Sequence, residues 1–122
     1  MTDENPLAGT GFVLTPAMRK ILDSIHDTEP GTPNLDCMDA GDLSAFAVAC
    51  YSNPLAEALR ARYYPERPMT KSMLRVIHSL GRYAAQQVFA RKRRLEGNIQ
   101  MAKFYESECE TLYRALPKWA KW

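Results

Sequence analysis

Cysteine and histidine are scarce in this chain. It has three cysteines and two histidines among 122 residues, and their spacing matches neither a zinc site nor a disulfide framework. No serine, cysteine or carboxylate stands at a spacing from a histidine that indicates a nucleophile with its base. We therefore expect no metal, no cofactor and no enzyme activity, and the unpaired cysteines suit the reducing cytoplasm.

Long apolar runs are also missing. No run approaches the roughly 18 apolar residues of a membrane span, and the acidic N-terminus lacks the basic start of a signal peptide. The hydrophobic fraction is 46% and the charged fraction is 25%, which are ordinary values for a globular protein. The length suits one domain. These features predict a single-domain cytoplasmic protein that does not enter a membrane.

Acidic residues are absent from one long stretch of the sequence. Residues 71–94 contain none, and residues 58–94 hold ten bases against one acid. Residues 1–57 have the opposite bias, with nine acids against two bases. The net charge of +2 hides this segregation. A field this polarised can steer a polyanion, or an oppositely charged protein surface, to one side of the molecule.

Capping residues and prolines divide the first half of the chain. Residues 1–13 predict a flexible arm, and residues 14–122 one helical domain. A first helix begins at Pro16 and ends near residue 27. The alanine-rich run 43–50 predicts a buried helix capped by Asp39 or Asp42. Pro54 then starts a short helix, or else kinks one longer helix.

The second half of the chain predicts two long helices. Thr70 caps a helical pattern that continues to about Leu95, and Gly97 with Asn98 allows the chain to reverse. A final helix follows over about 99–116. The whole pattern predicts an all-α, single-domain bundle of about five helices with a long C-terminal antiparallel helical hairpin.

The long helix is strongly two-sided. At about 100° per residue, four basic or polar residues lie within roughly 60° of one another. They are Lys71, Arg75, His78 and Arg82, and Gln86, Phe89 and Arg93 continue the row. The opposite face is apolar, and we expect it to be buried. It consists of Met73, Ile77, Leu80, Ala84, Val88 and Leu95.

Helix stability does not explain this basic row. An exposed helix usually mixes charges, since acid–base pairs four residues apart contribute about 0.2 to 0.5 kcal/mol each. Lys71 and Arg75 also stand near the positive end of the helix dipole, where bases are unfavourable. By contrast, bases in the last turn, such as Arg91, complement the dipole. Three explanations stay open: a binding function, internal pairing with the acidic half, or a plain solvated surface.

The leading hypothesis is a small, non-enzymatic nucleic-acid-binding protein. Arginine and lysine at intervals of about one turn suit phosphate oxygens and give salt-sensitive binding that is independent of sequence. Bases interleaved with Tyr63 and Tyr64 add to this pattern, unless one of these tyrosines caps the core. A helix-turn-helix is a weaker possibility, because two prolines interrupt its turn. The predicted nucleic-acid-binding residues are Lys71, Arg75, His78, Arg82, Arg93, Arg91 and Arg62.

The alternative is a protein–protein adaptor or inhibitor. Such a protein, phage- or plasmid-encoded, would act on a host nucleic-acid machine, for example a defence complex, through its acidic half or its basic face. A homodimer that pairs the acidic half of one copy with the basic helix of another is a third possibility. The predicted partner-binding residues are Asp36, Asp39, Asp42, Trp119 and Trp122.

Overall fold

A computed structural model describes residues 33–122, and over this range the protein is all α-helical, with no strand. Four α-helices follow one another: α2 (Ala40–Tyr51), α3 (Asn53–Tyr63), α4 (Lys71–Leu95) and α5 (Ile99–Ala115). Short 3₁₀ turns precede and follow them, η1 (Leu35–Cys37) and η2 (Lys118–Ala120). The predicted arm 1–13 and the predicted first helix lie outside the described residues. The described range therefore contains four α-helices, against about five predicted for the whole chain.

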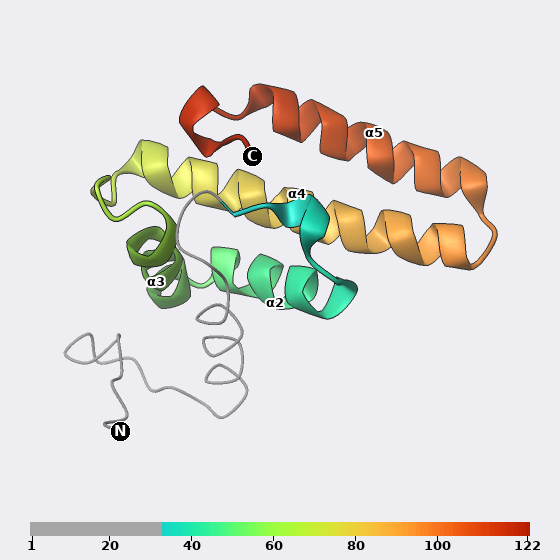
Figure 1. Cartoon of the computed structure of the whole chain (residues 1–122), viewed down its shortest axis with the longest axis horizontal. Coiled ribbons are helices and arrows are strands. Elements are labelled where there is room, and N and C mark those ends of the chain that lie inside the picture. The colour runs from blue at the N-terminus through green and yellow to red at the C-terminus, as the bar shows by residue number, and fades with distance from the viewer. Residues whose placement is uncertain (1–32) are drawn as a thin grey trace, which may run out of the picture.

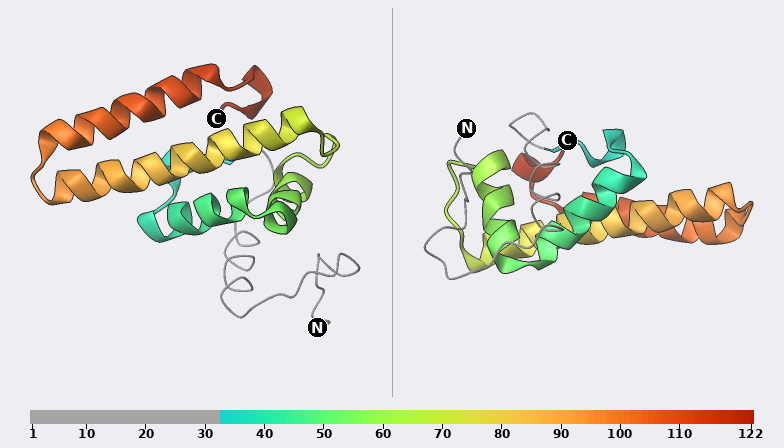
Figure 2. Two further views of the ribbon diagram at one scale, coloured as in Figure 1. Left: turned by 180° about the vertical axis from the view of Figure 1, so that it is seen from behind. Right: turned by 90° about the horizontal axis from the view of Figure 1, so that it is seen from below.

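The long helix α4 is the centre of the structure. Helix α5 runs antiparallel along one side of it, and α2 packs along the other side (Figure 1). Helix α3 joins α2 to the start of α4. The segment containing η1 crosses α4 near the C-terminal end of the chain, whereas from behind α4 lies between α5 and α2 with no described element over it (Figure 2, left). The described elements therefore leave one side of α4 open.

Local signals account for the bounds of α2 and α3. The Asp39 side chain accepts a hydrogen bond of 2.8 Å from the Asp42 backbone N–H, so Asp39 is the cap of α2. Ser52 is extended, with φ −103° and ψ 116°, and it separates the two helices. Pro54 stands in the first turn of α3, where its missing N–H costs nothing. Pro54 therefore starts a separate helix and does not kink a longer one.

Caps also define the C-terminal hairpin. The Thr70 hydroxyl accepts from the Met73 N–H at 3.1 Å and begins α4, as the sequence predicts. Gly97 has φ +81°, a left-handed conformation that favours glycine, and it turns the chain. The Asn98 side chain then caps α5. The predicted hairpin is confirmed to within about one residue at each end.

The buried face of α4 agrees with the sequence except at its end. Met73, Ile77, Leu80 and Ala84 are buried, and Val88 is half-buried. The prediction for Leu95 is wrong, because its side chain is 90% exposed. The η1 segment meets α4 one turn earlier, at Arg91, so the last turn of α4 extends beyond this neighbour.

The two tyrosines at the end of α3 belong to the core. Tyr63 and Tyr64 are both buried, so they are not surface aromatics interleaved with bases. Phe46 of α2 packs against Tyr63 with ring centroids 6.2 Å apart. Burying two aromatic rings contributes more apolar area here than any aliphatic pair would. The surface pattern of aromatics and bases is therefore wrong at these two residues, and the alternative, that a tyrosine here belongs to the core, is confirmed.

Cysteine exposure gives a direct test of this packing. Cys50 and Cys109 are buried, whereas Cys37 is exposed. Burial raises the pKa of the Cys50 thiol well above its usual value and that of Cys109 to about 12, so both remain protonated at neutral pH. We expect a thiol reagent to modify one cysteine per folded chain and all three in denaturant. Rapid modification of two or three thiols in the folded protein would contradict the structure.

Candidate nucleic-acid interface

Three bases of α4 form an exposed row. Lys71, Arg75 and Arg82 are exposed, and none of them has an ion pair within residues 33–122. At 1.5 Å per residue the row spans about 16 Å along the helix. We call these three residues the basic row.

The fold explains why the basic row has no acidic partner in the described range. The residues of α4 that contact η1 are Tyr83, Gln87 and Arg91. They point away from the basic row, at about 100° to 180° from its centre around the helix axis. The η1 acid Asp36 therefore lies across the helix from Lys71, Arg75 and Arg82. The acids of the described part of the first half do not neutralise these three bases, which argues against internal pairing there.

An aromatic pair flanks the basic row on the side of α2. The rings of His78 and Tyr51 stack, with centroids 5.5 Å apart and planes 20° from parallel, and Tyr51 is 56% exposed. Burial of its phenol raises the pKa of Tyr51, neighbouring Cys50 raises it further, and the nearby charge of Arg82 lowers it. His78 is half-buried beside the basic row, and its ring stacks on that of Tyr51.

The bases at the end of α4 are engaged within the protein. Arg91 donates to the carbonyl oxygens of Met38 at 2.6 Å and Asp36 at 3.3 Å, and so ties the η1 segment to α4. Arg93 pairs with Glu96, and Arg94 forms a two-pronged pair with Glu106 of α5. Of the predicted binding residues, Arg91 and Arg93 are therefore not free bases.

The bases of α3 also lie apart from the row. Arg62 is half-buried and interacts within the chain. Arg60 pairs with Glu57 at 2.7 Å and donates at 2.8 Å to the carbonyl of Arg67, just beyond the helix. This arrangement follows the helix dipole, because cations stabilise a helix C-terminus. The structure thus brings together Lys71, Arg75, His78 and Arg82 and leaves out Arg62.

The predicted acidic partner-binding residues have structural roles. Asp36 accepts from the Tyr83 hydroxyl at 2.6 Å, from Gln87 Nε2 at 3.3 Å and from Trp122 Nε1 at 2.9 Å. Asp39 caps α2, and Asp42 interacts elsewhere in the chain. These three carboxylates are therefore occupied, which weakens the case that they contact a partner.

Both tryptophans pack against the bundle. The ring of Trp122 lies edge-on to Tyr83 at 4.9 Å and to Tyr113 at 4.8 Å, and the Tyr113 hydroxyl donates to its carbonyl. Trp119 packs edge-on against Tyr64 at 5.3 Å. The ring of Trp122 is therefore engaged within the protein, which argues against the hypothesis that it docks on a partner.

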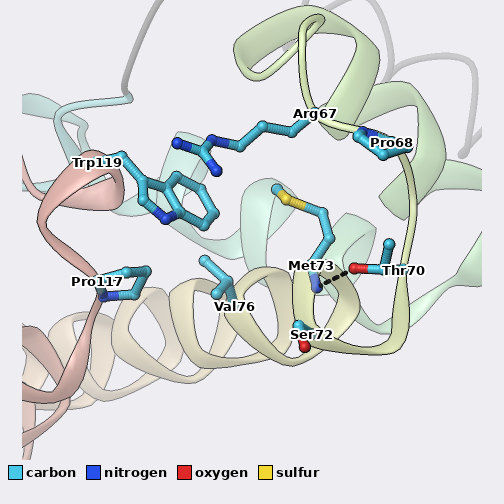
Figure 3. A pocket seen from close by; sticks show the side chains of 8 residues that line it. All are labelled: Arg67, Pro68, Thr70, Ser72, Met73, Val76, Pro117 and Trp119. Atoms are coloured by element: carbon cyan, nitrogen blue, oxygen red, sulfur yellow. Dashed lines mark hydrogen bonds between the residues drawn. The ribbon is translucent and has the colours of Figure 1, made fainter.

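A hollow of about 440 Å³ separates the start of α4 from the C-terminal segment (Figure 3). Met73 and Val76 line its floor, and Trp119 forms one wall. The Arg67 guanidinium carbon lies 3.8 Å from the centre of the Trp119 ring, a cation–π contact. Met73 and Val76 point away from the basic row, so the hollow is a separate feature.

Metal-binding clusters and membrane spans are both absent from the described range. Residues 33–122 contain no cluster of three or more histidine, cysteine or acidic side chains that could hold a metal. Within the same range, no helix has the length and apolar character needed to cross a membrane. No family model, curated protein or solved structure matches this chain.

The structure adds residues that the sequence did not single out. Tyr51 of α2 joins the basic row only through the packing of α2 on α4. Tyr105 of α5 lies next to Phe89, and Phe104 in turn lies next to Tyr105. Phe89 itself follows Lys71 by 18 residues, or five turns, and so continues the row as the sequence predicts.

Proposed function

We propose that this protein binds the phosphate backbone of nucleic acid through the basic row of α4. The observation that carries the proposal is that Lys71, Arg75 and Arg82 are exposed on the open side of α4 and have no ion pair in the described part of the chain. Three unneutralised bases on one rigid helix meet a polyanion without first breaking internal contacts. Because the site contacts phosphates, its affinity should not depend on the nucleotide sequence.

A titration at two salt concentrations tests the proposal. Labelled single- and double-stranded DNA and RNA would be titrated with the protein at about 50 and 200 mM salt. We expect affinity to fall steeply with salt. The triple variant Lys71→Gln, Arg75→Gln, Arg82→Gln should bind at least about tenfold more weakly, and its log–log salt slope should be shallower by about one for each phosphate that the protein no longer neutralises.

A second triple variant controls for net charge. Arg94→Gln, Arg114→Gln and Lys118→Gln also remove three charges, but from exposed positions outside the basic row. Breaking the surface pairs with Glu106 and Glu110 costs little stability. Equal losses in both variants would mean that only overall charge matters, and the proposal would be wrong. Absence of binding at both salt concentrations would also overturn it.

The adaptor hypothesis assigns partner binding either to the acidic half or to the basic face. Its acidic version requires carboxylates of the first half to face a partner, and Asp36, the hydrogen-bond acceptor for Trp122, is committed within the fold. Its basic version uses the same row as nucleic acid does. Failure to bind any oligonucleotide at either salt concentration would therefore favour the adaptor, whose partner is a protein.

A further inference from the structure

Three aromatic rings are clustered on the surface of the hairpin. Phe89 of α4 is 44% exposed and Phe104 of α5 is 54% exposed, and half-buried Tyr105 lies between them. Ring centroids are 5.5 Å apart for Phe89 and Tyr105, and 5.3 Å apart for Phe104 and Tyr105. We call these three residues the aromatic cluster. A contiguous exposed apolar patch on a small protein usually marks a contact surface.

The aromatic cluster continues the line of the basic row. Phe89 follows Arg82 by seven residues, which is close to two turns, so the two side chains leave the helix on the same side. The rise between them is about 10 Å. At the other flank, the exposed ring of Tyr51 stacks on His78 beside Arg82. Bases and ring surfaces therefore alternate across one side of the molecule.

This combination of bases and ring surfaces should bind single-stranded and duplex nucleic acid differently. A duplex hides the faces of its bases within its own stack and offers phosphates and base edges. A single strand exposes base faces, and proteins bind it by combining a basic track for the backbone with aromatic side chains for stacking. A surface that bound phosphates alone would have no use for exposed phenyl rings at the end of the track.

We propose that the aromatic cluster is a stacking platform for unpaired bases of single-stranded nucleic acid, whose phosphates follow the basic row. This inference rests on the proposed function and narrows its ligand to single strands. The charge of Lys71, Arg75 and Arg82 complements the backbone, and the rings of Phe89 and Phe104 complement the bases. Stacking accepts every base, so the expected selectivity is for strandedness and not for sequence.

Paired binding measurements test the platform. The double variant Phe89→Leu, Phe104→Leu keeps apolar side chains but removes two ring faces. We expect it to bind a single strand of about 12 nucleotides roughly tenfold more weakly or worse, and to bind a duplex of equal length as the unchanged protein does. Leu95→Ala is the matched control, because Leu95 is an exposed apolar residue of α4 outside the cluster. Circular dichroism melts would verify that each variant folds.

The possible results separate this inference from the function on which it rests. If neither strand type binds the unchanged protein, the proposed function fails and the platform with it. If both bind but the double variant keeps full single-strand affinity, the platform is wrong and the basic row still stands. If the double variant instead lowers the mass of a self-associated protein in solution, the cluster joins two copies, and the platform is also wrong.

Discussion

Replacing Gly81 with alanine should lower the free energy of unfolding by about 1 to 3 kcal/mol. Gly81 lies where α4 meets α2, and a Cβ atom added there would stand 2.5 Å from the Cβ of Cys50. Both atoms are attached directly to helix backbones, so neither can swing away. The better helix propensity of alanine returns only about 1 kcal/mol, and the overlap should therefore dominate. Urea denaturation would measure the change.

Gly41 provides the opposite case within the same protein. It lies in the first turn of α2, and a Cβ there would have its nearest neighbour at 3.4 Å, in the Asp39 side chain. Gly41→Ala should therefore be neutral or raise stability by up to about 1 kcal/mol, because alanine reduces the entropy of the unfolded chain. Equal effects of the two substitutions would show that α2 and α4 do not approach as described.

Replacing Asp36 with alanine should lower the free energy of unfolding by about 2 to 4 kcal/mol. The carboxylate accepts hydrogen bonds from Tyr83, Gln87 and Trp122, and it joins η1 to α4 and to the C-terminal segment. Hydrogen bonds to a charged group contribute more than neutral ones do, and the buried Tyr83 hydroxyl would lose its acceptor. Tryptophan fluorescence should shift as Trp122 loosens.

Two variants isolate the cause of this destabilisation. Asp36→Asn keeps the shape and one acceptor oxygen, so it should cost less than alanine. Trp122→Phe keeps a ring against Tyr83 and removes only the Nε1–H donor. A double-mutant cycle between positions 36 and 122 should give a coupling energy of at least about 0.5 kcal/mol. Additive effects would show that the Asp36–Trp122 hydrogen bond does not form.

The sequence was sufficient for features that depend on neighbouring residues. Asp39, Thr70 and Asn98 cap their helices because a short polar side chain reaches backbone N–H groups within the same turn. Gly97 turns the hairpin because it adopts positive φ without strain. The periodicity of α4 also separated its buried face from its basic side. Each signal acts over a few residues, and a sequence displays it directly.

Contacts between distant residues were not predictable in this way. Arg91 belongs to a basic run, yet its partners are the carbonyls of Asp36 and Met38, which the fold alone brings near. Asp36 was predicted to contact a partner, yet its carboxylate accepts hydrogen bonds from Tyr83, Gln87 and Trp122. The candidate site was only partly predicted, since Lys71, Arg75 and Arg82 share one helix, whereas Tyr51 and Tyr105 contact residues of this helix from α2 and α5.

The hydrogen bond between Asp36 and Trp122 also sets the order in which parts of the fold can form during synthesis. It links residues 86 positions apart, whereas α2, α3 and α4 contact one another and all lie within residues 40–95. On a ribosome, these three helices can pack together while α5 is still unmade. The hydrogen bond from Trp122 to the Asp36 carboxylate can form only after the C-terminal segment has been made. Until then Tyr83 of α4 lacks the Trp122 ring that packs on it, so a nascent chain that stalls within α5 exposes this part of its longest helix.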